Sequence, residues 1–230
     1  MRRIGLLGGM SWESSALYYS AINEGVRGAL GGLHSADLVM VSVDFDEIER
    51  LQSSGDWEAA GERLAAEAVR LQAAGAECVV LCTNTMHKVA DRVQAAVDIP
   101  LLHLADVTAD AVRDAGVSRV ALLGTRFTMR EPFYRDRLSA HGLDVLVPPA
   151  DTQAELDRII YDELVLGVVD EGSRSAYREA IGALVSRGAQ GVILGCTEIE
   201  LLVRPQDAPV PTFPTTALHA AAAVRFALAR

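Results

Sequence analysis

Residues 75–83 read GAECVVLCT, and residues 188–197 read GAQGVILGCT. Each stretch passes from a glycine through an apolar, β-branched run to a cysteine that is followed by threonine. An apolar run this short, bounded by glycine, is typical of a buried strand in a parallel sheet. The two stretches therefore predict two equivalent strands. Each ends in a thiol, Cys82 or Cys196, where the chain turns into a helix.

Strand and helix patterns alternate outward from these two stretches. We predict strands at residues 4–7, 38–43, 77–81, 100–104, 119–123, 143–147 and 191–194. We predict helices at residues 11–30, 56–74, 85–97, 128–141, 152–166, 173–187 and 216–228. Ser11 is the expected N-cap of the first helix, and Gly75 is expected to end the second. Strands that alternate with helices imply parallel sheets covered on both faces.

The two halves of the chain also resemble each other. Residues 4–8 (IGLLG) match residues 120–124 (VALLG), and Cys82 matches Cys196. We predict an α/β protein with two pseudo-symmetric, doubly wound domains, made of residues 1–98 plus 211–230 and of residues 99–210. Ligands of such folds bind at the carboxyl ends of the strands, so we expect the active site in the interdomain cleft. The alternative is one open sheet with a chance likeness between the halves.

Composition and charge exclude several classes of function. The 230 residues are 50% hydrophobic and 23% charged, which is ordinary for a globular protein. A net charge of -10 argues against nucleic-acid binding, which needs a basic face. No signal peptide or membrane span is evident, so we expect a cytoplasmic protein without a membrane partner. The three cysteines should be reduced, and no zinc-ligand spacing is present, so no metal is expected.

The two matched cysteines are the candidate catalytic groups. A helix N-terminus offers free N–H groups and a partial positive charge, which would lower the pKa of a thiol at that place. The same N–H groups could hold a substrate carboxylate. Hydroxyl and amide side chains that could assist them are those of Thr83, Asn84, Thr85 and Thr197.

Two further residues close to these cysteines admit a structural interpretation. Cys78 lies inside its predicted strand and has no counterpart in the second half, so we expect it to pack in the core. Glu198 follows Cys196 by two residues and could orient a substrate ammonium group or tune the thiol. It could equally act only on the helix dipole.

His87 and Lys88 lie in the predicted helix after Cys82. A nucleophilic Cys–His pair is conceivable, but a packing or surface role for His87 is the favoured interpretation. Lys88 is the single lysine of the chain and is expected to be solvated. Pyridoxal phosphate enzymes need a lysine for the Schiff base. We therefore expect no cofactor.

Four stretches resemble those of a known family: residues 4–15 (IGLLGGMSWESS), 75–90 (GAECVVLCTNTMHKVA), 121–129 (ALLGTRFTM) and 188–202 (GAQGVILGCTEIELL). They are similar to the cofactor-independent aspartate/glutamate racemase superfamily, in particular its aspartate and broad-specificity amino-acid racemase branch. The resemblance covers essentially the whole chain. Glutamate racemases typically carry GCTHYP at the second cysteine, and decarboxylase relatives keep only one of the two cysteines.

The resemblance implies a two-thiol isomerase that interconverts L- and D-amino acids. Cys82 and Cys196 would be the paired acid/base groups: one thiolate removes the Cα proton, and the other thiol protonates the opposite face. The substrate carboxylate must then be held by donors that strengthen as charge develops. The resemblance also implies a homodimer that acts on a small amino acid without pyridoxal phosphate. Substrate-binding residues expected in this chain are Met10, Gln52, Thr83, Asn84, Thr85, Thr197 and, from its spacing to Cys196, Glu198.

Two departures from the family pattern bear on the substrate. Family members often have Asp before the C-terminal Thr-Thr, where this chain has Pro214. Archaeal aspartate racemases bind the side-chain carboxylate with an arginine, which Gln52 replaces here, and with a lysine, for which the second half of this chain offers no lysine. A polar, uncharged pocket fits broad specificity or a neutral polar substrate. Arg50 or Arg126 could supply the charge instead.

Two other functions stay open. One is a decarboxylase or isomerase of the same superfamily that acts on a small dicarboxylate. The other is a non-catalytic two-domain protein that closes on a small acid. Paired thiols argue against a mere binding protein, which has no need of thiolates.

Overall fold

Two parallel β-sheets form the centres of two structural units. A computed structural model describes residues 1–229 and places Met1–Leu104 and the segment from His219 onward in unit 1, and Ala105–Leu218 in unit 2. The predicted α/β fold class with parallel sheets is therefore confirmed. The domain limits at residues 98 and 210 stay a prediction. Among the described helices, none is both long and apolar enough to cross a membrane.

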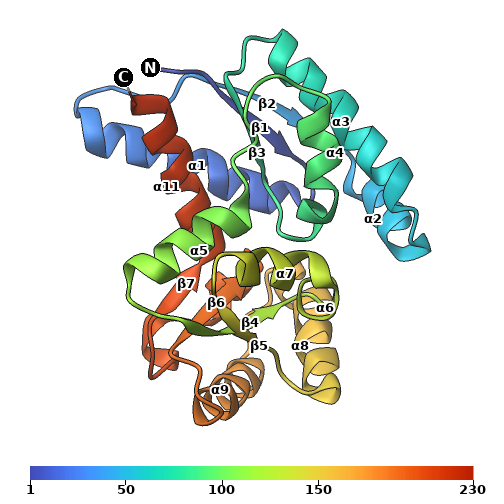
Figure 1. Cartoon of the computed structure of the whole chain (residues 1–230), viewed down its shortest axis with the longest axis vertical. Coiled ribbons are helices and arrows are strands. Elements are labelled where there is room, and N and C mark those ends of the chain that lie inside the picture. The colour runs from blue at the N-terminus through green and yellow to red at the C-terminus, as the bar shows by residue number, and fades with distance from the viewer. Residues whose placement is uncertain (230) are drawn as a thin grey trace. The chain divides into compact units, whose positions relative to one another are not determined.

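The sheet of unit 1 has the strand order β2–β1–β3, with all strands parallel (Figure 1). The strands are β1 (Ile4–Gly8), β2 (Leu38–Ser42) and β3 (Cys78–Leu81). The helices are α1 (Trp12–Leu30), α2 (Phe45–Ser54), α3 (Trp57–Ala73), the 3-10 helix η1 (Thr85–Val89), α4 (Ala90–Ala95) and α11 (Thr215–Leu228), whose first turn belongs to unit 2. Ser11 caps α1 by accepting a hydrogen bond from Ser14 N, as its position predicted.

Helices cover both faces of this sheet because alternate strand residues point to opposite sides. Leu6 of β1 belongs to a buried cluster with Tyr18 of α1 and Ala223 of α11. Leu7, the next residue, belongs to a second cluster with Leu64 of α3. Burying a leucine side chain contributes about 1.5–3 kcal/mol, so these two clusters hold the unit together.

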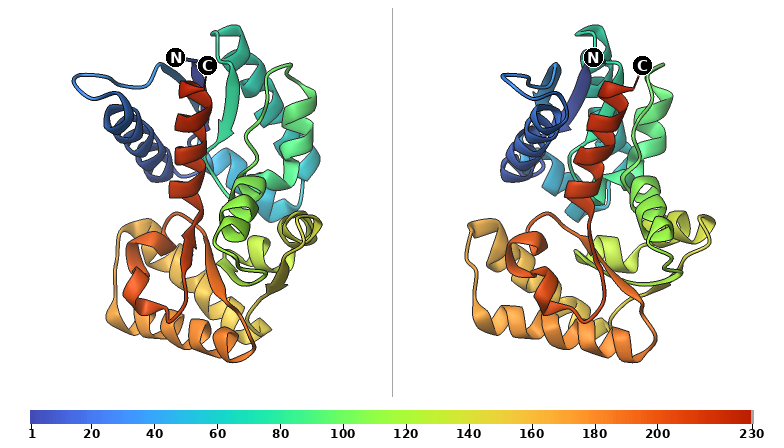
Figure 2. Two further views of the ribbon diagram at one scale, coloured as in Figure 1. Left: turned by 60° about the vertical axis from the view of Figure 1, so that its left-hand side comes forward. Right: turned by 90° about the vertical axis from the view of Figure 1, so that its left-hand side faces the viewer.

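Helices α1 and α11 lie side by side in unit 1 (Figure 2). Gly25 of α1 faces α11 so closely that a Cβ at this position would lie 2.9 Å from Val224 Cγ2. Arg2 N, just before β1, donates to Ala227 O near the end of α11 at 2.9 Å. A segment more than 200 residues away along the chain thus completes the core around β1.

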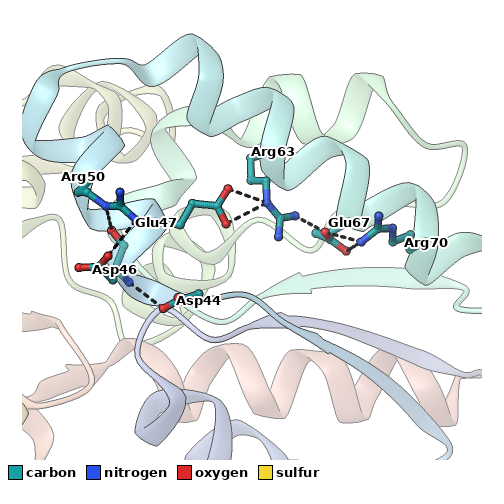
Figure 3. A network of polar contacts seen from close by, with 7 residues as sticks. All are labelled: Asp44, Asp46, Glu47, Arg50, Arg63, Glu67 and Arg70. Atoms are coloured by element: carbon teal, nitrogen blue, oxygen red, sulfur yellow. Dashed lines mark hydrogen bonds and ion pairs between the residues drawn. The ribbon is translucent and has the colours of Figure 1, made fainter.

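Charged side chains join α2 to α3 (Figure 3). Arg63 Nε of α3 lies 3.1 Å from Glu47 Oε1 of α2, and Arg63 also binds Glu67 one turn later. Arg70 Nη1 lies 2.8 Å from the same Glu67 carboxylate. The Glu67 side chain is 2% exposed, against 31% and 71% for the two arginines. Two guanidinium groups thus compensate one buried carboxylate, which would be costly to bury alone.

Unit 2 has a four-stranded parallel sheet in the order β5–β4–β6–β7. Its strands are β4 (Arg119–Gly124), β5 (Asp144–Leu146), β6 (Gly191–Gly195) and β7 (Thr212–Pro214). Its helices are α5 (Leu104–Asp114), α6 (Arg126–Arg130), α7 (Pro132–Ala140), α8 (Ala150–Asp162), η2 (Leu164–Leu166), α9 (Glu171–Ser186), α10 (Ile199–Leu202) and η3 (Pro205–Asp207). Leu123 and Leu194 of the sheet share a buried cluster with Leu156 of α8 and Ile181 of α9.

Four predicted elements differ from the structure. The helix at 152–166 is α8, which ends at Asp162, followed by the 3-10 helix η2. The helix at 128–141 is two helices, because Pro132 begins α7 and holds the preceding Glu131 in an extended conformation. The helix at 85–97 begins as the 3-10 helix η1 and ends with α4. The strand at 100–104 is wrong: only an isolated parallel bridge joins Val79 to Leu101, and α5 begins at Leu104. Helices α2, α5 and α10, the 3-10 helix η3 and strand β7 were not predicted.

Candidate functional site

The two matched cysteines follow equivalent strands of the two units. Strand β3 pairs with β1, the first strand of unit 1, and β6 pairs with β4, the first strand of unit 2. Cys82 comes directly after β3, and its backbone N–H donates to Leu7 O at 2.9 Å. Cys196 comes directly after β6. Both thiols therefore lie at the carboxyl edge of a parallel sheet, where ligands of such folds bind.

The repeat is offset by one residue at the cysteines. Strand β3 ends at Leu81, next to Cys82, whereas β6 continues to Gly195 before Cys196. Gly195 pairs with Gly124 of β4, and a Cβ on Gly195 would lie 2.9 Å from a backbone oxygen of β4. This close approach of the two strands requires glycine.

Cys82 lies in an apolar environment. It is fully buried in the cluster that includes Ile4 and Tyr18, and its Sγ is 3.6 Å from Val80 O. Burial raises the pKa of the Cys82 thiol well above its ordinary value, because an apolar surrounding disfavours the thiolate. The predicted lowering of this pKa by a helix N-terminus is wrong. The following helix, η1, is one short 3-10 segment that begins only at Thr85.

Cys196 has a carboxylate as its polar partner. Its Sγ donates to Glu198 Oε2 at 2.9 Å, and the residue is 8% exposed. Burial raises the pKa of Cys196 well above its ordinary value, and the negative charge of Glu198 raises it further. The predicted lowering of the pKa is wrong here too, since α10 has only four residues. The short S–H to carboxylate contact gives the Cys196 proton an acceptor.

The polar residues after Cys82 lie in the turn between β3 and η1. Asn84 and Thr85 are buried, and Thr83 is half-buried. His87 binds this turn twice: its Nδ1 lies 2.7 Å from Thr83 O, and its backbone N–H donates to Asn84 O at 3.1 Å. In unit 2, Thr197 is buried beside Cys196.

Met10 and Gln52 come together with the segment that follows Cys82. Both are buried, and Met10 shares a cluster with Met86 of η1. Gln52 Nε2 of α2 lies 2.9 Å from Met86 Sδ. Three segments that are distant in the sequence therefore meet in unit 1, and helix α2, which was not predicted, supplies one of them.

Two ionisable groups near Cys196 escaped the sequence analysis. Burial raises the pKa of Glu200 to about 7, and its Oε1 accepts a hydrogen bond from Thr216 N at 3.2 Å. Tyr177 of α9 shares the buried cluster with Cys196, and its hydroxyl donates to Leu156 O at 3.3 Å. Glu200 could have been noticed as an acid within an apolar run, whereas nothing in the sequence marks Tyr177.

Cys78 and Lys88 each pack against neighbouring side chains of unit 1. Cys78 is fully buried in β3, which confirms its predicted place in the core, and burial raises its pKa to about 12. Lys88 was predicted to be solvated, but its Nζ lies 3.8 Å from the centre of the Trp57 ring, where a cation is attracted to the aromatic face. No group of three metal-binding side chains occurs in residues 1–229.

The two arginines that could supply a positive charge to the substrate pocket are both exposed. Arg50 is exposed on α2 and pairs with Asp46 at 2.9 Å. Arg126 is exposed at the start of α6, with its guanidinium 4.9 Å from the centre of the Phe127 ring. Pro214 ends β7 and pairs with a residue of β6.

A groove of about 510 Å³ between α8 and α9 is lined by none of the predicted site residues.

Comparisons with known proteins agree with this architecture. A sequence model described as Asp/Glu/Hydantoin racemase matches residues 7–223. A putative Asp/Glu racemase from Yersinia pestis is 54% identical in sequence, covers 99% of this chain and 100% of its own, and superposes with a TM-score of 0.95. An aspartate racemase homologue from Pyrococcus horikoshii is 34% identical over 99% of both chains, with a TM-score of 0.88. The broad-specificity amino-acid racemase RacX of Bacillus subtilis is 20% identical over 98% of both chains.

Proposed function

Because this chain belongs to the family of Asp/Glu/hydantoin racemases, we propose that it inverts the Cα of a small amino acid without a cofactor. Cys82 and Cys196 are the two acid/base groups of this proposal. The observation that carries it is one buried thiol after an equivalent strand in each unit. Racemisation needs a base on one face of Cα and an acid on the other, and two thiols supply both roles in either direction.

The proposed reaction moves two protons. One cysteine, as the thiolate, takes the proton from Cα and leaves a carbanion or enediolate. The other cysteine, as the thiol, gives its proton to the opposite face of the same carbon. A thiolate of high pKa is a strong base toward a weakly acidic Cα–H, so burial of Cys82 and Cys196 favours this step once the thiolate has formed.

Formation of the thiolate needs a proton acceptor. Glu198 Oε2, at 2.9 Å from Cys196 Sγ, is the acceptor that we propose for that thiol. Transfer from sulfur to Glu198 also removes the carboxylate charge that disfavours the thiolate. Glu198 thereby has a role in tuning the thiol, one of the two that its spacing suggested.

The polar residues beside the cysteines are the proposed carboxylate donors. Negative charge builds up on the substrate carboxylate as the Cα proton leaves, and fixed donors stabilise that charge. This role falls to Thr83, Asn84, Thr85 and Thr197. Met10 and Gln52 line the remainder of the proposed site, and the uncharged Gln52 favours broad specificity or a neutral polar amino acid over strict aspartate specificity. The resemblance further supports a homodimer. The cytoplasmic location stays the prediction made from the sequence.

Proton NMR in D2O tests this function. Purified protein is incubated with L-aspartate, L-glutamate or L-homoserine in the absence of pyridoxal phosphate. The Cα–H signal should disappear while the D-enantiomer forms. Cys82→Ser and Cys196→Ser should each abolish inversion. Cys78→Ala, which changes the buried core cysteine, is the control and should retain it.

Three results would count against the proposal. Normal inversion by both single serine variants would exclude the two-thiol mechanism. Release of carbon dioxide or a shifted double bond from a small dicarboxylate, without Cα exchange, would identify a decarboxylase or isomerase. Tight ligand binding that survives both Cys→Ser changes, without turnover, would identify a binding protein.

A further inference from the structure

Three histidines of unit 1 form a cluster of rings, and one of them, His87, contacts the turn that follows Cys82. The ring centroids of His87 and His103 are 4.7 Å apart, and those of His87 and His219 are 5.8 Å apart. His87 and His219 are buried. None of the three has a part in the proposed proton transfers, although imidazole is the side chain best suited to titrate near neutral pH.

The partners of His87 define its protonation state. Nδ1 lies 2.7 Å from Thr83 O, which can only accept, so Nδ1 carries the proton. Leu104 N donates to Nε2 at 3.2 Å, so Nε2 carries none. His87 is therefore neutral with its proton on Nδ1. Burial lowers its pKa, and the neighbouring His103 and His219 lower it further, which keeps the imidazole neutral.

His219 is fixed in the opposite tautomer. Its Nε2 lies 2.6 Å from Leu102 O and must donate to that carbonyl. Its Nδ1 then accepts from the Tyr18 hydroxyl at 2.9 Å. Burial lowers the pKa of His219 to about 4. The chain at the start of α5 is thus held at Leu102 by His219 and at Leu104 by His87.

The hydrogen bond from His87 determines the direction of a peptide group in the proposed site. In a trans peptide the C=O of one residue and the N–H of the next point in opposite directions. Because His87 Nδ1 holds Thr83 O, the N–H of Asn84 points away from the imidazole. The same bond restrains the backbone directly after Cys82, whose own N–H is already fixed to Leu7 O at 2.9 Å.

We propose that His87 is a positioning residue for the acid/base group Cys82 and for the Thr83–Asn84 peptide. The proposal rests on the proposed racemase function, in which Cys82 acts on Cα and the following turn binds the carboxylate. His87 does not touch the substrate and exchanges no proton with it. It holds the turn through Thr83 O, with Leu104 N as the anchor on its other side.

Three variants of His87 separate this role from simple packing. His87→Asn can place an amide donor near the position of Nδ1 and so keep the bond to Thr83 O. His87→Gln places its amide near Nε2, toward Leu104, and loses that bond. His87→Phe fills the space and loses both bonds. Urea unfolding of all three gives the folded fraction by which rates are corrected.

Two measurements decide the outcome. We expect His87→Phe and His87→Gln to lower kcat for racemisation about 10- to 100-fold, as small displacements of catalytic groups do, with KM changed less than threefold. His87→Asn should stay within about threefold of wild type. Independently of turnover, the rate of Cys82 alkylation, followed by peptide mass spectrometry, should change in His87→Phe and His87→Gln. It should stay as in wild type in His87→Asn, with Cys196 as the internal reference.

Each result supports or refutes the positioning role. Equal losses in His87→Asn and His87→Phe would refute it, and so would wild-type kcat in His87→Phe. If the wild-type protein does not racemise any amino acid, the proposed function fails. The alkylation rates then still show whether His87 controls the position of the Cys82 thiol.

Discussion

Acid should destabilise unit 1 through the buried histidine His219. The neutral imidazole donates to Leu102 O at 2.6 Å and accepts from the Tyr18 hydroxyl, and it is fully buried. Burial lowers its pKa to about 4 from an ordinary value of 6.5. The unfolded chain therefore binds a proton near pH 6.5, while the folded chain does so only near pH 4.

The sign and size follow from this difference in pKa. Stability contributed by neutral His219 is complete above pH 6.5, because neither state is protonated there. It is lost as the pH falls toward 4, since only the unfolded state gains a proton. The gap in pKa corresponds to about 3 kcal/mol in total, of which about 2 kcal/mol is lost between pH 7 and pH 5.

The stability contributed by Glu200 depends on pH in the opposite direction. The effect of His219 must therefore be measured by comparing variants. The pKa of Glu200 is raised to about 7 from 4.5, so its contribution becomes more favourable as the pH falls through the same range. The total free energy of unfolding of the wild type therefore combines both effects with that of His87, whose pKa is also lowered by burial. His219→Gln removes one titration and keeps a donor and an acceptor at the site.

Urea unfolding at pH 7, 6 and 5 provides the assay. Both tryptophans, Trp12 and Trp57, lie in unit 1, so their fluorescence reports on the unit that contains His219. His219→Gln should be less stable than wild type at pH 7, and this deficit should shrink by about 2 kcal/mol at pH 5. His34→Gln, which changes an exposed histidine outside the cluster, is the control. A deficit that does not change with pH would refute the buried, neutral state of His219.

Two more predictions concern Gly8 and Glu198. Gly8→Ala should lower the free energy of unfolding by about 1–3 kcal/mol, because its Cβ would lie 2.5 Å from Ser15 Oγ. Gly28→Ala, with nothing within 4 Å of the new Cβ, should raise it by about 0.5–1 kcal/mol, and equal effects in urea unfolding would disprove the clash. Glu198→Gln should lower the pKa of the Cys196 thiol by removing a nearby negative charge; an unchanged pH dependence of Cys196 alkylation would contradict this.

Local signals were sufficient to predict much of the fold. Strands β1, β3 and β6 are short apolar runs ended by glycine or cysteine, and the structure has them within a residue or two of the predicted limits. Helix α1 was recognised from its N-cap, Ser11, and α11 was predicted at residues 216–228. Helix α2 escaped notice although Asp44 caps its start and Gly55 ends it. With only ten residues, its apolar stripe is too short to distinguish it from a loop.

The sequence identified the cysteines but not their electrostatics. Whether a helix begins at Cys82 or three residues later depends on where the 3-10 turn forms, and apolar spacing does not distinguish the two. Burial of Cys82 depends on α1 and α11, which are distant in the sequence. The direction of a thiol pKa shift is therefore a tertiary property. The role of His87 also depends on tertiary structure, because its hydrogen-bond donor Leu104 N lies 17 residues further along the chain.

The place of α11 has a consequence for biosynthesis. Unit 2 is one continuous stretch, Ala105–Leu218, and all of its residues have been synthesised before the last helix of unit 1 is complete. Until then Tyr18 lacks its partner His219, and the apolar face of β1 lacks Ala223. The part of the chain made first should thus be the last to reach its native state. Nascent unit 1 would depend on chaperones for longer than unit 2.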